Sequence, residues 1–357
     1  MEKISVTING RELEGLRDQT ILDLALENDI DIPHLCYDPR LSAVGACRLC
    51  LVEIEGQRGL QTSCTRQIEP GMVIRTDTDE IRRLRKTVLE LLMSEHGARC
   101  LTCDDDGECE LQRYAYEYQI NPDRFADVTP VRTTRNYTQE SKAIHYDPSK
   151  CIRCGRCVRM CAEVQQDHAL VLSGRAMDVA VTTAFDLPLN ETTCETCGNC
   201  VLACPTGALY EVAAKRRGQT RDLEKVRTTC AYCGVGCQMD LCVDREANSI
   251  VRVTSEPGVI PNDGMLCIKG HFATEFVSDS ERLTTPLVRR DGNLEPASWP
   301  EAIKLVAEHF AKIKAESGPN AIAGLSSAKC TNEENHVFQK FMRAAVGTNN
   351  VDHCARL

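Results

Sequence analysis

The sequence lacks the features of several large classes of protein. No window approaches the roughly 18 consecutive apolar residues that a membrane-spanning helix requires, so direct membrane insertion is not expected. The first residues show neither a basic segment followed by an apolar stretch nor a twin-arginine motif, which predicts a cytoplasmic protein. The formal net charge of -10 argues against nucleic acid as a partner.

Aromatic residues are scarce, at 4% of the 357 residues, whereas cysteine is abundant, with 22 residues. In a reducing cytoplasm disulfides are disfavoured, and clustered Cys-x2-Cys spacings usually bind metal. The composition therefore predicts metal sites. The length predicts more than one domain, and the mixed strand and helix patterns predict an α+β multidomain protein.

Residues 1–78 form the first predicted domain. Alternating apolar residues over 4–8 and 11–16 flank Asn9-Gly10, the pair that suits a tight hairpin turn, and a capping box at Thr20 opens a helix. Strand, turn, strand and helix before a cysteine loop is the opening of a β-grasp ferredoxin. The cysteines that follow resemble a 2Fe-2S pattern, with zinc as the alternative: Cys36, Cys47, Cys50 and Cys64.

Residues 79–145 are predicted to hold a second site. Apolar residues recur with a helical period from Asp79 onward, and this helix ends near His96. A lone histidine at a helix end is usually not a ligand, but three cysteines at close offsets downstream indicate that this one is: Cys100, Cys103 and Cys109. A neutral imidazole in place of a thiolate should raise the reduction potential of the site. Residues 110–145 are assigned only as a connector.

Residues 146–215 contain an internal repeat. A run of Cys151, Cys154, Cys157 and Cys161 recurs as Cys194, Cys197, Cys200 and Cys204, the arrangement of bacterial two-cluster ferredoxins. In such proteins the fourth cysteine of each run binds the other cluster. The repeat thus predicts two 4Fe-4S sites that exchange Cys161 and Cys204. Structural zinc prefers two separated ligand pairs, so it fits this spacing poorly.

The remaining sequence divides into two parts. Residues 224–285 carry one more four-cysteine set, with zinc again the alternative: Cys230, Cys233, Cys237 and Cys267. Residues 286–357 show α/β patterning, with a helix over 301–314, a strand over 321–325 and a helix over 331–346 that Gly347 ends.

Iron in clusters prefers soft thiolates, four ligands to a cluster. Nineteen of the cysteines and His96 fill five such sites, which predicts one 2Fe-2S and four 4Fe-4S clusters. For Cys242 we expect a packing role. Cys330 lies between a predicted strand and helix, where α/β sheets bind ligands, so it is a candidate cofactor-pocket residue, with packing as the alternative.

The motifs in this order resemble one family, the NAD(P)-linked formate dehydrogenase catalytic subunits, whose N-terminal modules are shared with the large electron-transfer subunit of complex I. The resemblance lies in His96-Gly-Ala-Arg-Cys100, in the double ferredoxin run and in Cys230-Ala-Tyr-Cys233-Gly-Val-Gly-Cys237. It extends to Ser326–Asn335 and to Gly347–Leu357, which is similar to the family sequence preceding the selenocysteine or cysteine that binds the metal.

The resemblance implies an oxidoreductase in which Mo or W, held by two pterin guanine dinucleotides, converts formate to CO2. It implies that Lys269 lies between the nearest cluster and a pterin, with a solvated surface lysine as the alternative. The implied partners are a flavin-bearing NAD(P) subunit of the diaphorase type or a ferredoxin-linked partner, other iron-sulfur subunits and a hydrogenase module.

Two helices and one strand cannot complete a layered α/β domain, so a fragment is expected, one not competent for formate oxidation by itself. A UGA selenocysteine codon taken as a stop after Leu357 would explain it, and DNA sequence beyond that position tests the hypothesis. Two other functions remain open: a complex I-type large subunit and a stand-alone iron-sulfur carrier. Molybdenum or tungsten beside about eighteen irons in the full-length protein favours the formate dehydrogenase.

Overall fold

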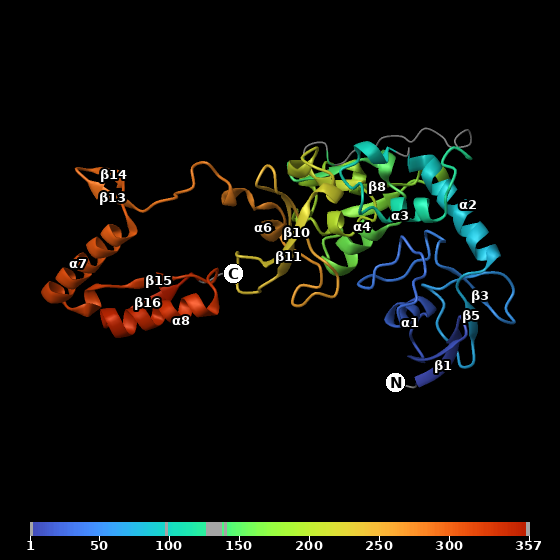
Figure 1. Cartoon of the computed structure of the whole chain (residues 1–357), viewed down its shortest axis with the longest axis horizontal. Coiled ribbons are helices and arrows are strands. Elements are labelled where there is room, and N and C mark those ends of the chain that lie inside the picture. Colours follow the sequence, from blue (N-terminus) through green and yellow to red (C-terminus); the bar gives the residue numbers. More distant parts are fainter. Residues whose placement is uncertain (1–2, 97–98, 126–137, 139–140, 355–357) are drawn as a thin grey trace.

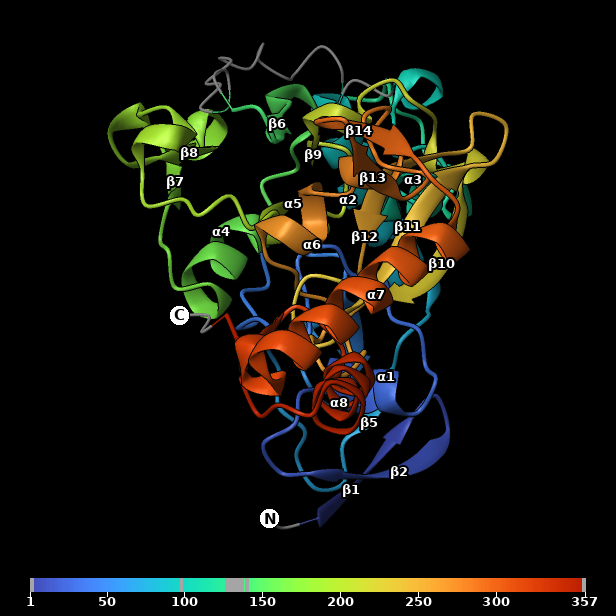
Figure 2. The ribbon, with the colours of Figure 1, turned by 90° about the vertical axis from the view of Figure 1, so that its left-hand side faces the viewer.

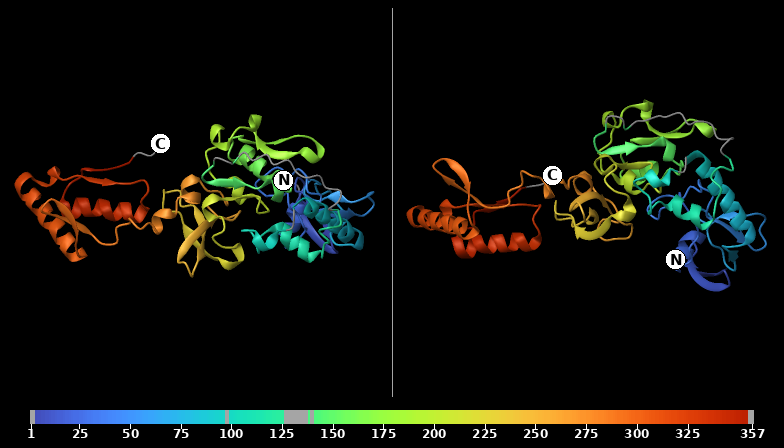
Figure 3. Two further views of the ribbon diagram at one scale, coloured as in Figure 1. Left: turned by 90° about the horizontal axis from the view of Figure 1, so that it is seen from above. Right: turned by 45° about the horizontal axis from the view of Figure 1, so that its top comes forward.

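The protein is described from a computed structural model, which covers residues 3–96, 99–125, 138 and 141–354. The chain is elongated, with the N-terminal elements at one end and the C-terminal helices at the other (Figure 1). Two further views show the C-terminal lobe joined to the remainder by an extended segment (Figure 3). No helix among the described residues is both long and apolar enough to cross a bilayer.

The N-terminal domain is a five-stranded mixed sheet. Its order is β2-β1-β5-β3-β4, and β1 pairs with β5 in parallel. The strands are β1 (Lys3–Ile8), β2 (Arg11–Leu16), β3 (Leu51–Ile54), β4 (Gln61–Thr62) and β5 (Val73–Arg75). Helix α1 (Ile21–Glu27) begins with the predicted capping box between Thr20 and Asp23, and its apolar face packs on the sheet. This is the predicted β-grasp arrangement.

Helix α2 (Asp79–His96) follows the first domain, as its apolar period predicts. Its buried Arg85 donates hydrogen bonds to the carbonyl oxygens of Leu49 and Leu51 at 3.0 and 2.8 Å, which fixes the helix to the cysteine loop of the first domain. Helix α3 (Glu110–Glu117) lies within the stretch assigned only as a connector. Its buried Leu111 and Tyr114 pack against α2, a tertiary contact that weak local patterning did not indicate.

The cysteine repeat forms two similar halves. Strands β6 (Ile144–Tyr146) and β9 (Leu209–Glu211) pair antiparallel, as do β7 (Leu170–Ser173) and β8 (Ala180–Thr183). Each run turns at a glycine in the left-handed conformation, Gly155 at φ 71° and Gly198 at φ 83°, because a side chain is disfavoured there. Each glycine precedes a short helix, α4 (Arg156–Arg159) or α5 (Asn199–Leu202).

A three-stranded antiparallel sheet comes next, ordered β10-β11-β12. Its strands are β10 (Glu224–Thr229), β11 (Gln238–Asp244) and β12 (Ser249–Thr254), and helix α6 (Ile268–Phe272) packs against β12. Cys242 on β11 is fully buried, in the packing position expected for it.

The C-terminal lobe holds more strands than the sequence predicts. A hairpin of β13 (Leu287–Arg290) and β14 (Asn293–Pro296) precedes α7 (Trp299–Ser317), and β15 (Gly324–Ser326) pairs in parallel with β16 (Val351–His353). Between them lies α8 (Asn332–Lys340), which continues as a π-helix η12 (Phe341–Val346) up to Gly347. Strand β15 starts at residue 324 instead of 321, since a 3-10 turn occupies Pro319–Ala321.

Seen end-on, α7 and α8 lie at the front of the C-terminal lobe (Figure 2). An apolar groove of about 530 Å³ runs along α7 and η12, where Trp299, Ile303 and Val306 are exposed. Parts of four predictions lie outside the described residues: positions 1–2 of the first domain, 97–98 of the motif between His96 and Cys100, 126–137 and 139–140 of the connector, and the last three residues of the family-like ending.

Candidate metal centres

Nineteen of the 22 cysteines, together with His96, form five sets, and each set takes the name of one member. The Cys36 site consists of Cys36, Cys47, Cys50 and Cys64, all buried in the first domain. The amide of Cys47 lies 3.4 Å from the Cys36 sulfur, and side-chain contacts join Cys36 to Cys64 and Cys64 to Cys50. These four sulfurs lie in the loop after α1 and in the loops that flank β3 and β4.

The His96 site lies where α2 ends and α3 begins. Its four members line one cavity of about 380 Å³: His96, Cys100, Cys103 and Cys109. The ammonium nitrogen of Lys150 lies 3.4 Å from the Cys103 sulfur, and this cation favours a thiolate there. The Cys109 sulfur lies 3.7 Å from the carbonyl oxygen of Pro205, the residue that follows Cys204 of the next site.

The Cys151 site combines the first three cysteines of the first run with the fourth cysteine of the second run. A cavity between β6, α4 and β9 is lined by all four members: Cys151, Cys154, Cys157 and Cys204. Burial raises the pKa of the Cys154 thiol to about 12, whereas the backbone amide of Arg156 lowers it. A bare thiolate is therefore disfavoured here, and a bound cation such as iron would stabilise it.

The Cys194 site shows the reciprocal exchange. A separate cavity is lined by its four members: Cys161, Cys194, Cys197 and Cys200. The amide of Thr196 lies 3.3 Å from the Cys194 sulfur, and burial raises the pKa of Cys197 to about 11. Backbone amides that point at sulfur are the environment that stabilises thiolate-bound clusters.

The Cys230 site joins the β10–β11 turn to the start of α6. The Cys230 amide donates to the Cys237 carbonyl at 2.8 Å, and the Cys237 thiol has three thiols as electrostatic neighbours: Cys230, Cys233 and Cys267. Burial raises the pKa of Cys267, but the amides of Gly270 and Lys269 outweigh it and the pKa falls. This thiol stands at the N-terminus of α6.

The ligands and surroundings of the five sets indicate which kind of metal centre they suit. Each set offers four ligands, each is drawn from loops that converge, and three of the sets surround cavities. Among the described residues, no three His, Cys, Asp or Glu side chains converge closely enough to hold a single metal ion. The donor chemistry, with four ligands in each set and thiols in nineteen of the twenty positions, fits iron-sulfur clusters.

Two candidates outside the sets lie near the C-terminal lobe. Lys269 is half-buried on α6, two residues after Cys267. Cys330 lies in the loop between β15 and α8, where its carbonyl oxygen accepts a hydrogen bond from Asn335. An added Cβ on Gly234, in the Cys230 site, would lie 3.9 Å from the Ala328 carbonyl, so the loop that carries Cys330 faces that site.

The structure also reveals residues that the sequence pattern did not single out. Cys354, at the end of β16, accepts a hydrogen bond from the Ala328 amide at 3.3 Å, and contacts with Ser327 and Ala328 lower its pKa. Asp38, Glu110 and Arg156 form ion pairs beside cysteines of three different sites, in which Asp38 and Arg156 are buried and Glu110 is half-buried. In the sequence, each of these charged residues lies within two positions of a ligand cysteine, where burial is expected. That proximity could have identified them.

Five family models match successive parts of the chain. In order, they describe a 2Fe-2S iron-sulfur cluster binding domain, an NADH-ubiquinone oxidoreductase-G iron-sulfur binding region, an NADH-quinone oxidoreductase subunit 3 ferredoxin-like domain, a molybdopterin oxidoreductase Fe4S4 domain and a molybdopterin oxidoreductase. They match residues 1–79, 85–124, 141–210, 223–279 and 282–357. The chain belongs to the molybdopterin oxidoreductase family of the NADH-quinone oxidoreductase G type.

Members of this molybdopterin oxidoreductase family match over nearly the whole chain. An NADH-quinone oxidoreductase subunit of the G type from Rhizobium meliloti is 38% identical over 99% of the chain and 40% of its own length. A Staphylococcus aureus protein named as a formate dehydrogenase is 29% identical over 99% of the chain and 39% of its own length. The chain thus spans about 40% of the length of the curated relatives it matches.

A solved structure resembles part of the chain. A chain of the crystal structure of an NAD+-reducing [NiFe]-hydrogenase in the H2-reduced state superposes with a TM-score of 0.55 at 30% identity, over 61% of this chain and 91% of that one. The chain is therefore an iron-sulfur electron-transfer module of this molybdopterin oxidoreductase family.

Proposed function

We propose that this chain is the iron-sulfur relay of a formate dehydrogenase, one that exchanges electrons between a Mo- or W-bis-pterin site and an NAD(P)- or ferredoxin-linked partner. The observation that supports the proposal is the presence of five four-ligand sets in one chain, next to a segment that matches the molybdopterin oxidoreductase model. When bound, one 2Fe-2S and four 4Fe-4S clusters would supply one-electron chemistry.

The chain contributes ligands and a controlled electrostatic environment. The Cys36 site would hold the 2Fe-2S cluster, and the other four sites would hold 4Fe-4S clusters. Amides of Thr196 and Arg153 lie 3.3 to 3.4 Å from ligand sulfurs and stabilise the thiolate form. Lys150 adds a positive charge beside Cys103, which favours the reduced cluster of the His96 site.

Formate as the substrate rests on two supports. One is the family-like ending: Ser326–Asn335 runs from the end of β15 through the following loop into α8, and residues 347–354 contain the loop before β16 and β16 itself. The other is the Staphylococcus aureus relative named as a formate dehydrogenase. In this proposal Lys269 and Cys330 lie toward the pterin, and a diaphorase-type NAD(P) subunit is the partner.

A second candidate is a complex I-type large subunit. The Rhizobium meliloti relative carries an NADH-quinone oxidoreductase name at 38% identity, and two of the family models come from complex I. The NAD+-reducing hydrogenase favours an NAD-linked partner in either case. The complete reading frame distinguishes them, because the formate dehydrogenase requires a metal-binding selenocysteine or cysteine beyond Leu357.

The experiment is anaerobic reconstitution of the chain, followed by iron and sulfide analysis and EPR of the reduced sample. We expect about eighteen irons for one 2Fe-2S and four 4Fe-4S clusters. Zinc in place of iron would refute the relay. For the substrate, the full-length protein is assayed for formate-dependent dye reduction and for Mo or W; iron without either metal would refute the formate dehydrogenase and favour the second candidate.

A further inference from the structure

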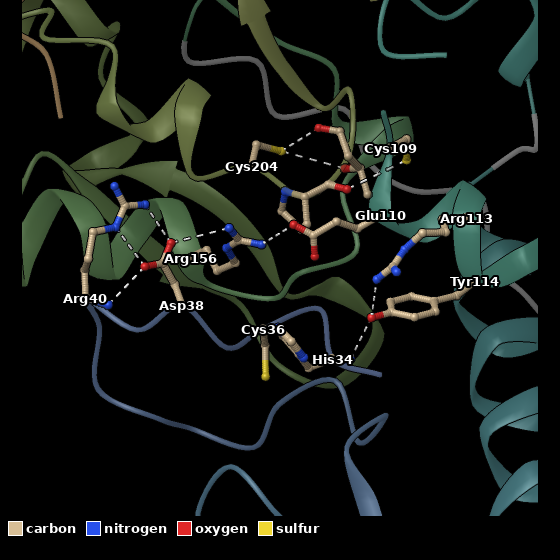
Figure 4. Close-up of polar contacts among 12 residues, drawn as sticks. His34, Cys36, Asp38, Arg40, Cys109, Glu110, Arg113, Tyr114, Arg156 and Cys204 are labelled. Carbon is tan, nitrogen blue, oxygen red and sulfur yellow. Dashed lines mark hydrogen bonds and ion pairs between the residues drawn. The ribbon is translucent and has the colours of Figure 1, made fainter. Parts of the chain in front are cut away.

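Three cluster sites meet at one buried guanidinium. Arg156 lies between two ligand cysteines of the Cys151 site, and its side chain is 10% exposed. Its Nη1 lies 2.9 Å from Glu110, the residue after Cys109 of the His96 site. Its Nη2 lies 3.4 Å from Asp38, two residues after Cys36, so the same group contacts loops of all three sites (Figure 4).

The carboxylate of Asp38 is held from the other side as well. Arg40 donates to both of its oxygens, at 2.9 and 2.8 Å, and the Asp38 side chain is 1% exposed. Arg40 also donates to the carbonyl oxygen of Asp263 at 3.0 Å, in the domain of the Cys230 site. A second arginine of α4, Arg159, donates to the carbonyl oxygen of Cys36 at 2.6 Å.

We propose that Arg156 is a positioning residue that fixes these three sites relative to one another and whose charge raises the reduction potential of the Cys151 site. The inference rests on the proposed electron relay. A buried ion pair adds little stability, because desolvation offsets the attraction, but it specifies geometry where its partners lie on separate loops. The guanidinium suits this role because its planar fork can bind two carboxylates at once, which an ammonium does poorly.

The charges of Arg156 and Asp38 should shift the reduction potential of the Cys151 site in opposite directions. Adding an electron to a cluster adds negative charge, so a nearby cation favours the reduced state and a nearby anion opposes it. Arg156→Gln removes a positive charge and should lower the potential of the Cys151 site. Asp38→Asn removes a negative charge from the same network and should raise it. A purely structural role predicts no such opposite signs.

The test is an EPR-monitored redox titration of the full iron-loaded chain. At a fixed solution potential, we expect the ratio of reduced to oxidised Cys151 cluster to fall at least about threefold in Arg156→Gln and to rise by a similar factor in Asp38→Asn. Arg156→Lys keeps the charge, so its potential should stay near that of the unmodified chain, while magnetic interaction with the Cys36 cluster weakens because one carboxylate is released.

The matched control is Arg245→Gln. Arg245 is 63% exposed and pairs with Glu224 on the β10–β11 sheet, so water and salt screen the same change of charge. We expect no change of potential. Full iron content with unmoved potentials in Arg156→Gln and Asp38→Asn, or shifts of the same sign, would overturn the inference alone. Failure of the unmodified chain to take up iron would instead overturn the proposed relay.

Discussion

The Nε2 atom of His271 lies 3.1 Å from a carboxylate oxygen of Glu211, and both side chains are buried. His271 is on α6, four residues after Cys267, and its Nδ1 lies 3.3 Å from the carbonyl oxygen of Cys197. The ring stacks on Phe272. One imidazole therefore joins the Cys230 site to the Cys194 site across a domain boundary.

We predict that His271→Ala lowers the free energy of unfolding by about 2 to 4 kcal/mol, because it leaves a cavity and a buried Glu211 without its neighbour. The measurement is denaturant unfolding of the anaerobic, iron-loaded chain. His309→Ala is the control, since His309 is exposed on α7 and should change stability by no more than about 0.5 kcal/mol. Equal midpoints for the two variants would contradict this role.

Alanine should be tolerated less well at Gly198 than at Gly258, although both glycines have a left-handed conformation. A Cβ at this position would overlap the imidazole of His271, whereas a Cβ on Gly258, at nearly the same φ of 82°, would meet nothing within 4 Å. Gly258→Ala should cost about 1 to 2 kcal/mol for the backbone conformation alone. Gly198→Ala should cost about 1 to 3 kcal/mol more for the overlap. Thermal unfolding of both variants measures the difference, and similar losses would show that the ring moves aside freely.

The His96 site is predicted to respond to its unusual ligand. His96→Cys supplies a fourth thiolate, so we expect iron content to be retained and the reduction potential of this site to fall. Redox titration followed by EPR checks the direction. In His309→Cys, the added thiol lies on exposed α7 and the potential should not move. An unchanged potential in His96→Cys would show that His96 is not a ligand.

Iron removal should unfold parts of the chain selectively. The core around β6 and β9 includes six ligand cysteines among its apolar side chains, whereas the first domain buries many aliphatic side chains around β1 and β2. After chelation we expect amide exchange to accelerate in residues 144–146 and 209–211 while 3–8 and 11–16 stay protected, because metal binding and folding are coupled. Hydrogen exchange with mass spectrometry compares the two states. Uniform protection after chelation would contradict the coupling.

Much of the local structure could be predicted because it is encoded in short patterns. The hairpin at Asn9-Gly10, the capping boxes at Thr20 and Thr331, and α2 before His96 all depend on neighbouring residues. The five ligand sets were predicted from the cysteine spacing, and their role as cluster ligands stays a prediction.

The tertiary features could not be predicted in the same way. Helix α3 is stabilised by packing on α2, and β16 pairs with a strand 27 residues away. The Arg156 network joins residues separated by 46 and 118 positions, a relationship that spacing does not express. Such contacts form only in the folded chain, where buried charged side chains lie next to partners that are distant in the sequence.

The exchange of Cys161 and Cys204 between the two ferredoxin-like halves has a consequence for biosynthesis. The cavity around Cys151 contains Cys204, so the ribosome must complete both halves before that cage can close. Iron that binds during translation of the first half would find three of the four thiols, with the fourth ligand still missing. Maturation of the first half therefore waits for translation of the second.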